Sequence, residues 1–176
     1  HKKAIEYAIK HNGIISFDPN VRLPLWESPQ ECRQAILEFL PLAHIVKVSD
    51  EELEFITSIK DEEEALKSLF VGNVEVVIYT KGTNGSEFIT KGRTIHVPSF
   101  RVKVEDTTGA GDSYIGSFLY QVAQTVDTLE AFVQLDEEKV MDMMTFSAAT
   151  AALTVSKKGA IAALPTKEAV IEMMSR

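Results

Sequence analysis

The stretch Val74–Thr80 constrains the fold more than any other part of the sequence, because it is a nearly continuous run of β-branched and other apolar residues. Such a run predicts a strand covered on both faces, as in a parallel sheet, whereas a strand with one solvated face alternates apolar and polar residues. Shorter strand patterns precede it at 14–17 and 44–48, and helical patterns separate the three. Strands that alternate with helices imply right-handed crossovers, so we predict an α/β fold with a mostly parallel sheet.

Start and stop signals set the bounds of the other elements. Ser28–Glu31 and Ser49–Glu52 are capping boxes, in which Ser and Glu side chains satisfy the first free N–H groups of a helix. The dipeptides Asn84–Gly85 and Lys91–Gly92 predict a β-meander after Thr80. We expect one compact α/β unit over residues 1–176, with helices at about 5–9, 28–40, 49–58, from 61, 110–124, 137–155 and 166–174, strands at 87–90 and 94–97, and a strand-like segment at 102–104.

Composition and charge exclude several functional classes. The chain has 176 residues and a net charge of −8, from 18 Lys+Arg against 26 Asp+Glu, which argues against nucleic acid as a partner because phosphate backbones require clustered cations. No apolar run reaches the roughly 18 residues of a membrane span, so no membrane contact is expected. Cys32 is the single cysteine, which excludes an internal disulfide; since the sequence shows no signal peptide, we expect a cytoplasmic protein.

The glycine-rich turn Asp106–Asp112 carries the most informative chemistry, with the sequence Asp-Thr-Thr-Gly-Ala-Gly-Asp before a long helix. Glycines at such a turn let the backbone approach a ligand closely. The free N–H groups of the first helical turn and the positive end of the helix dipole then favour a phosphate group. Asp112 is either a general base for an attacking hydroxyl or only a stabiliser of the helix start, and this segment alone leaves both interpretations open.

Other ligand-binding motifs and metal sites are excluded. The chain contains no Gly-Lys-Ser/Thr ending of a Walker P-loop, and Tyr114 stands where a dinucleotide fingerprint has its third glycine. Asp18–Arg22 is not a calcium loop, because Arg22 takes a ligand position and no glycine follows. The four histidines lack the spacing of metal ligands.

The run from Asp106 to Phe118 resembles the C-terminal signature of the ribokinase-like (PfkB) sugar kinases. The resemblance implies a three-layer α/β/α sandwich with a mostly parallel sheet. It also implies that this chain is the C-terminal portion, without the N-terminal sugar-binding half and its lid. The implied catalytic roles suit phosphoryl transfer, where positioning and charge stabilisation do most of the work. Gly109, Ala110 and Gly111 would form the anion hole for the transferred phosphoryl group. Asp112 would be the base on the sugar hydroxyl.

Two segments resemble the family's metal and nucleotide motifs. Glu52 matches the Glu of an Asn-x-x-Glu motif that orders Mg²⁺ through water, although Ser49 replaces the Asn and the segment is also a complete capping box. The segment after the third strand resembles a turn that lies along the phosphates and ribose of the nucleotide, with a plain hairpin turn as the alternative. The implied nucleotide-binding residues of that turn are Thr80, Lys81, Gly82 and Gly85.

The resemblance extends to the helix that backs the adenine and to a cation site. Ser147 stands in this helix where the family usually has Asn, and Gly159 belongs to the loop that closes the pocket. Tight helix packing is the alternative interpretation of the small residues around Ser147. Many relatives bind a monovalent cation such as K⁺ beside the anion hole, and Asp106 and the Thr108 carbonyl would be its ligands here.

The segment Asp18-Pro-Asn-Val-Arg22, followed by Leu-Pro-Leu-Trp, is similar to fructokinases within the family. The resemblance implies that Asp18, Asn20 and Arg22 line the catalytic cleft, with Arg22 near the substrate or phosphate. Ligands of open α/β sheets gather at such strand ends. The alternative is an Asx turn with an exposed arginine.

The resemblance therefore implies ATP-dependent phosphorylation of a sugar's primary hydroxyl, most like that of fructokinase, with ATP, Mg²⁺ and K⁺ as cofactors. Another sugar, a sugar acid or a nucleoside as acceptor stays open, as does a non-catalytic nucleotide-binding module. The lid strands of the family often form a dimer, so a homodimer is expected of the full-length protein.

Because the sugar-binding motifs of the family's N-terminal half are missing, we expect the 176-residue chain alone to phosphorylate no sugar detectably. A coupled ADP-release assay on the purified chain, with fructose and ATP, measures this. Turnover above the no-sugar background would contradict the expectation.

Overall fold

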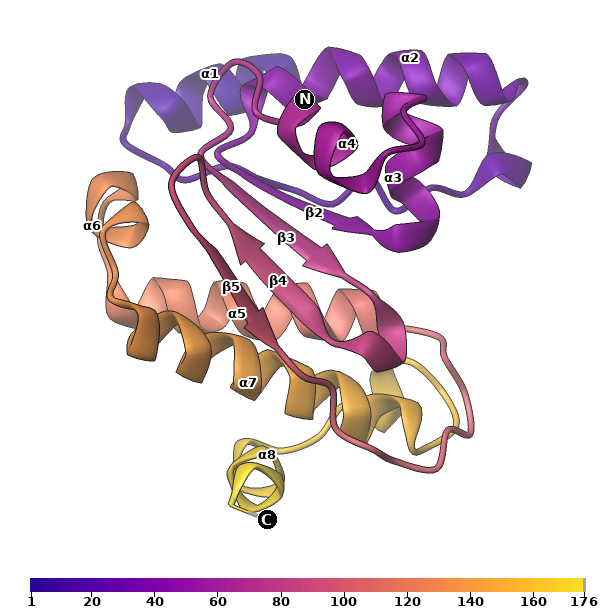
Figure 1. Ribbon diagram of the computed structural model, residues 1–176, viewed down its shortest axis with the longest axis vertical. Helices are drawn as coiled ribbons and strands as arrows, with labels where there is room; N and C mark the ends of the chain where they lie inside the picture. The colour runs from indigo at the N-terminus through magenta and orange to yellow at the C-terminus, as the bar shows by residue number, and fades with distance from the viewer. Residues whose placement is uncertain (176) are drawn as a thin grey trace. The chain divides into compact units, whose positions relative to one another are not determined.

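The computed structural model of the protein describes residues 1–175 (Figure 1). The α-helices are α1 (Lys2–Lys10), α2 (Pro29–Phe39), α3 (Asp50–Thr57), α4 (Glu62–Ser68), α5 (Ala110–Thr125), α6 (Leu129–Val133), α7 (Glu137–Val155) and α8 (Lys167–Met174). The strands are β1 (Ser16–Phe17), β2 (Ile45–Ser49), β3 (Val76–Thr80), β4 (Ser86–Ile89) and β5 (Thr94–Val97). Short 3-10 helices occur at η1 (Leu23–Leu25), η2 (Leu40–Leu42), η3 (Gly82–Asn84) and η4 (Ile161–Ala163). No helix among these residues is both long and apolar enough to cross a bilayer.

The chain forms two compact units. The N-terminal unit contains residues 1–80, 87–94 and 128–133, and the C-terminal unit contains 81–86, 95–127 and 134–175. The boundary passes through β4 and β5, so each unit is built from more than one stretch of sequence. The organisation of the whole chain as a single α/β unit stays a prediction.

The sheet confirms the topology expected from the alternation of strands and helices. The strands are hydrogen-bonded in the order β1-β2-β3-β4-β5. The β1–β2 and β2–β3 pairs are parallel, with Phe17 opposite Val46 and Ser49 opposite Thr80. Because the strands are parallel, the segments that follow Phe17, Ser49 and Thr80 leave the sheet at the same edge, where ligands of open α/β sheets bind.

His44 helps to set the alignment of β1 on β2. The ring Nδ1 of His44 accepts a hydrogen bond from the backbone N–H of Ile15 at 2.9 Å. The backbone N–H of His44 donates to the Ile15 carbonyl at 2.8 Å. The ring is therefore a buried acceptor, and burial lowers the pKa of His44 below its ordinary value. The strand expected at 14–17 is observed only at Ser16–Phe17. Ile15 is joined to the sheet by backbone hydrogen bonds to residues 44 and 45.

Helices α2, α3 and α4 pack on one face of β2 and β3 in the N-terminal unit (Figure 1). At the expected capping box of α2, Ser28 Oγ accepts from the Glu31 N–H, and at that of α3 the Ser49 and Glu52 side chains make both capping bonds. At the start of α4, the Asp61 side chain accepts from the Glu64 N–H. The apolar side chains of this core come from all three helices and from alternate strand positions: Cys32, Ile36, Leu40, Val46, Val48, Leu53, Ile56, Ala65, Leu66, Leu69, Val77 and Tyr79. The intervening strand residues Ile45, Val76 and Ile78 are also fully buried, so β2 and β3 are covered on both faces as predicted.

Helix α6 has no counterpart among the expected elements. It is only five residues long, and its sequence carries no strong helical signal apart from Thr128, whose hydroxyl accepts from the Ala131 N–H. Phe132 anchors it by an edge-to-face contact with Phe88, at 5.9 Å between ring centroids. Tertiary packing, which no local pattern reveals, therefore stabilises this helix.

The C-terminal unit is built around α5, α7 and α8, whose bounds lie within two residues of those expected. Phe146 and Ala149 of α7 pack against Val170 of α8. A buried polar chain joins three elements: Ser86 Oγ lies 2.7 Å from the Tyr114 hydroxyl, which donates to the Met144 sulfur at 3.4 Å. These hydrogen bonds link the start of β4 to the second turn of α5 and to α7.

The expected strand at 102–104 is wrong. The structure has an irregular segment there, and Val104 is half exposed. The Val-Lys-Val alternation is too short to pair by itself, and the nearby backbone bonds go to the end of α7, from the Glu105 and Asp106 N–H groups to the Val155 carbonyl. A strand needs a neighbouring edge, and this segment has none among the residues that the structure describes.

Gly72 is required by a close approach in the N-terminal unit. It has φ +58, and a Cβ there would lie 2.3 Å from the Pro41 carbonyl oxygen. We expect Gly72→Ala to lower the free energy of unfolding by about 3 kcal/mol, because it combines left-handed strain with a backbone clash. A urea unfolding curve of the purified protein measures the change.

Gly92→Ala is the matched control, since a Cβ at Gly92 meets nothing within 4 Å and its φ is not in the left-handed region. We expect its urea midpoint to stay near that of the unsubstituted protein. Equal effects of the two substitutions would contradict the clash at Gly72.

Candidate active site

The N-terminal unit places a buried ion pair between the carboxyl end of β1 and the middle of β2. Asp18 directly follows Phe17, whose register partner is Val46, so Asp18 lies beside Lys47. The Lys47 Nζ is 3.4 Å from each Asp18 carboxylate oxygen, and the two side chains are 7% and 16% exposed. Sequence reasoning missed Lys47, although a lysine inside the apolar run Ile45–Val48 is a detectable signal that a buried charge needs a partner.

The segment after Asp18 is a tight turn. The Asn20 N–H donates to the Asp18 carboxylate at 3.2 Å, as in an Asx turn, and Asn20 adopts the left-handed conformation with φ +44. Arg22 at its end is exposed, and its guanidinium donates to the Val21 carbonyl at 3.0 Å. The structure thus shows the Asx turn with an exposed arginine, and the lining of a catalytic cleft by Asp18, Asn20 and Arg22 stays a prediction.

Glu52 ties this turn to the start of α3. One carboxylate oxygen accepts from the Val21 N–H at 2.8 Å, and the other accepts from the Ser49 N–H at 3.0 Å and the Ser49 hydroxyl at 2.9 Å. Glu52 is only 9% exposed. Three bonds leave its carboxylate with one lone-pair site, which suits an indirect contact with a metal through water better than direct ligation.

The two carboxylates of this cluster have pKa values that are shifted in opposite directions. Burial raises the pKa of Asp18, and the nearby Lys47 opposes this shift. Burial also acts to raise the pKa of Glu52, but the backbone bonds from Ser49 and Val21 and the charge of Lys47 together bring it below its ordinary value. Glu52 is therefore the firmly ionised member of the pair, and the charge on Asp18 depends more on its lysine.

The glycine-rich turn lies in the C-terminal unit and begins α5. Gly109 is the N-cap residue with φ +81, and the Ala110 N–H donates to the Thr107 carbonyl at 3.2 Å. Within residues 1–175, the backbone N–H groups of Gly111 and Asp112 have no hydrogen-bond partner. These two donors point from the positive end of a 16-residue helix, and they are the ones available to an anion.

Asp112 presents an exposed carboxylate in the same turn. Of the three residues expected to form the anion hole, Gly111 offers a free N–H, Ala110 uses its N–H in the turn, and Gly109 supplies the backbone conformation. The geometry therefore places an exposed carboxylate and free backbone donors on one helical turn.

Asp106 holds the glycine-rich turn against the loop at Gly159. Its two carboxylate oxygens accept from the Thr108 N–H at 2.9 Å and the Gly159 N–H at 3.1 Å. Hydrogen bonds from Thr108, then from the Gly159 backbone, lower the pKa of Asp106. An ionised carboxylate suits a monovalent cation, so Asp106 fits the expected cation site.

The turn expected to follow the nucleotide begins at Thr80 in the N-terminal unit and continues in the C-terminal one. The Lys81 N–H donates to the Gly85 carbonyl at 2.8 Å, and Gly82 and Gly85 have φ +50 and +91. A Cβ at Gly85 would lie 2.3 Å from the Val97 carbonyl oxygen. Thr80 Oγ1 donates to the Val48 carbonyl at 3.5 Å. The turn is thus an ordered 3-10 turn rather than the two-residue hairpin that Asn84–Gly85 alone suggests.

Ser147 is a correction to the expected cofactor-binding set. Its side chain is fully buried, and its hydroxyl donates to the Met143 carbonyl one turn earlier in α7 at 2.8 Å. No polar atom of Ser147 is therefore available to a ligand, and the helix-packing interpretation of the small residues around it holds.

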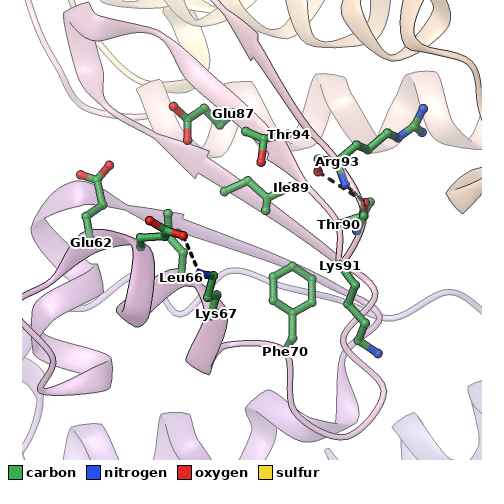
Figure 2. A pocket seen from close by; sticks show the side chains of 12 residues that line it. Glu62, Leu66, Lys67, Phe70, Glu87, Ile89, Thr90, Lys91, Arg93 and Thr94 are labelled. Atoms are coloured by element: carbon green, nitrogen blue, oxygen red, sulfur yellow. Dashed lines mark hydrogen bonds and ion pairs between the residues drawn. The ribbon is translucent and has the colours of Figure 1, made fainter.

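A hollow lies elsewhere in the N-terminal unit. It has a volume of about 760 Å³ and lies between α4 and the β4–β5 hairpin (Figure 2). Leu66, Phe70 and Ile89 form its apolar part, and charged side chains of both signs surround them. None of the predicted site residues lines it.

The residues present fit a magnesium ion that is held mainly by phosphates. Residues 1–175 contain no group of three or more His, Cys, Asp or Glu side chains that could hold a metal ion. Mg²⁺ commonly keeps several waters and binds through one or two carboxylates together with substrate phosphates. Glu52, with one lone-pair site left, is compatible with such an indirect role.

Comparisons with known proteins agree on one family. The sequence profile described as "pfkB family carbohydrate kinase" matches residues 2–167. The chain is 42% identical over 167 residues to "Probable fructokinase-2" of Arabidopsis thaliana, which corresponds to 94% of this chain and 49% of that protein. It is similar to a fructokinase with bound ATP from Xylella fastidiosa, with TM-score 0.91 and 30% identity over 98% of this chain and 55% of that one.

A second solved structure gives the same result. It is a double-mutant fructokinase from Vibrio cholerae O395 with fructose, ADP and a potassium ion bound, and it matches with TM-score 0.88 and 31% identity over 98% of this chain and 54% of that one. These similarities confirm the predicted ribokinase-like α/β fold. The chain spans about half the length of these relatives.

Gly109 allows a direct test of the turn that begins α5. A Cβ there would lie 3.1 Å from the Ala160 Cβ, with φ in the left-handed region. We expect Gly109→Ala to lower the free energy of unfolding by about 1–2 kcal/mol, measured by urea unfolding. Gly116→Ala on the same helix meets nothing within 4 Å and should raise it by about 1 kcal/mol, because Gly disfavours helix interiors. The same sign for both substitutions would contradict the geometry.

Proposed function

Because the chain belongs to the pfkB family of carbohydrate kinases, we propose that the complete protein transfers the γ-phosphoryl group of ATP to the primary hydroxyl of fructose. The observation that carries the proposal is the first turn of α5, where free N–H donors and the exposed Asp112 carboxylate occur together. Similarity to fructokinases at about 40% identity supports the choice of fructose.

Asp112 is the proposed catalytic base. Its carboxylate takes the proton of the sugar hydroxyl as the oxygen attacks the γ-phosphorus, the bond from that phosphorus to the β–γ bridging oxygen breaks, and ADP leaves. The N–H groups of Gly111 and Asp112, with the α5 dipole behind them, stabilise the negative charge on the transferred group. Gly109 and Ala110 hold the turn in the shape that leaves these donors free.

The nucleotide-binding role belongs to the turn Thr80–Gly85 and to the loop at Gly159. Glycine at 82 and 85 lets the backbone approach phosphates without a side chain, and Lys81 adds a positive charge to a chain whose net charge is −8. Ser147 takes no direct part, since it is buried and bonded within α7.

The sugar-binding and ionic roles belong to the other clusters. Asp18 and Asn20 bind sugar hydroxyls, and the exposed Arg22 binds the substrate or its phosphate. Glu52 would contact Mg²⁺ through water, and the ion would neutralise charge on the ATP phosphates. Asp106 and the Thr108 carbonyl would hold a monovalent cation such as K⁺, and a potassium ion is bound in the double-mutant fructokinase of Vibrio cholerae O395.

The cellular setting and assembly follow from the same proposal. Cys32 is free and buried, which suits a reducing compartment such as the cytoplasm. We propose that the full-length protein forms a homodimer through lid strands that this chain lacks. Sedimentation velocity of the full-length protein distinguishes a dimer from a monomer.

We expect Asp112→Asn in the complete gene product to lower kcat by a factor of about 10² to 10⁴, while ATP affinity stays close to that of the unsubstituted protein. The amide keeps the shape of the side chain but cannot accept the proton. Coupled turnover assays and calorimetric titration with ATP measure the two effects.

Asp142→Asn, at an exposed position on α7, is the control and should leave both quantities unchanged. Unchanged turnover in Asp112→Asn would remove Asp112 as the base. A panel of acceptors that includes fructose, other sugars, sugar acids and nucleosides tests the substrate. Phosphorylation of another acceptor with none of fructose would overturn the assignment of fructose.

A further inference from the structure

Lys47 is a buried charge for which the proposed reaction has no use. It stands in the middle of β2, where Ile45, Val46 and Val48 are almost completely buried, and it is itself only 6% exposed. Lysine is rarely buried unless it is paired, because an isolated ammonium group is costly to remove from water. An apolar residue here would leave the Asp18 carboxylate without its partner, whereas an apolar pair in place of both residues would avoid the cost of burying two charges.

The pairing of Lys47 is limited to one residue. Within residues 1–175, its ammonium group contacts only the Asp18 carboxylate, at 3.4 Å from each oxygen. These distances are longer than the 2.7–2.9 Å or so of a strong charge-assisted bond. The pair therefore provides charge compensation at the base of the Asp18 turn more than it provides a strong hydrogen bond.

Asp18 connects Lys47 to the turn Asp18–Arg22. Its carboxylate accepts from the Asn20 N–H and so holds Asn20 at φ +44, a conformation that side-chain-bearing residues rarely adopt. Val21 is fixed separately by its N–H bond to Glu52. The turn is thus anchored to β2 through Lys47 and to α3 through Glu52. Arg22 comes directly after the anchored residues Asn20 and Val21.

We propose that Lys47 is a positioning residue for the sugar: through Asp18 it fixes the Asp18–Arg22 turn so that Asn20 and Arg22 are presented to the substrate. This inference rests on the proposed function, which assigns the turn to sugar binding. It predicts that Lys47 acts on sugar affinity rather than on the phosphoryl-transfer step, since the anion-binding donors and Asp112 belong to a different turn.

The first test is Lys47→Met in the complete gene product. We expect the KM for sugar to rise by a factor on the order of 10 to 100, while kcat and the KM for ATP change little, because a displaced turn loses substrate orientation. Lys47→Arg, which keeps the charge, should recover most of the sugar affinity. Lys67→Met, at an exposed lysine paired with Glu63, is the control and should change none of the three constants.

The second test asks whether Lys47 acts through Asp18. In an Asp18→Asn background, adding Lys47→Met should raise the KM for sugar no further, because the group that Lys47 positions is already neutral. This double variant removes both members of the buried pair, so it stays testable if Lys47→Met alone does not fold. A further rise as large as that of the single variant would mean that Lys47 contacts substrate independently, which would overturn the positioning role.

The third test separates this inference from the proposed function. Hydrogen–deuterium exchange of the peptide that covers residues 16–22 reports the order of the turn whether or not sugar is phosphorylated. We expect exchange there to accelerate about tenfold or more in Lys47→Met, with no change around Gly159. If exchange accelerates in Lys47→Met but the unsubstituted protein phosphorylates no sugar, the proposed function is wrong and the role of Lys47 in ordering the turn is supported. Unchanged exchange in Lys47→Met would overturn the inference about Lys47.

Discussion

The parallel pairing of β1, β2 and β3 is the constraint on which the N-terminal unit depends. Because the three strands run in one direction, the segments that follow Phe17, Ser49 and Thr80 leave the sheet at the same edge. That arrangement brings Asp18 beside Lys47 and brings the Val21 N–H to the Glu52 carboxylate, although more than 25 residues separate each pair. Burial of both faces of the sheet then makes every charge at its edge depend on a partner.

The C-terminal unit exposes backbone N–H donors at the start of α5. A left-handed Gly109 begins α5 in such a way that the N–H groups of Gly111 and Asp112 remain unpaired. Asp106 fixes the turn by accepting from both the Thr108 and the Gly159 N–H groups. The turn thus combines free backbone donors with the positive end of a helix dipole, in a chain whose net charge is −8.

Local patterns predicted most of the elements and failed where packing decides. The capping boxes, the glycine turn and the continuous apolar run Val74–Thr80 are short-range signals, so their elements were placed within a few residues. The strand-like 102–104 failed because a strand needs an edge to pair with, and α6 was missed because the Phe88–Phe132 contact stabilises it. Ser147 lies on the expected helix, but which side of a small-residue helix is buried cannot be read from its composition.

The sequence by itself determined the α/β class, the glycine-rich turn with Asp112, and the family resemblance, because each is encoded by neighbouring residues. The tertiary structure alone decided which side chains share a charge or a hydrogen bond across strands. It made Glu52 the link between a helix start and the Val21 N–H, and it paired Lys47 with Asp18. The physical reason is that partner choice depends on strand register and burial, which arise only when distant segments pack together.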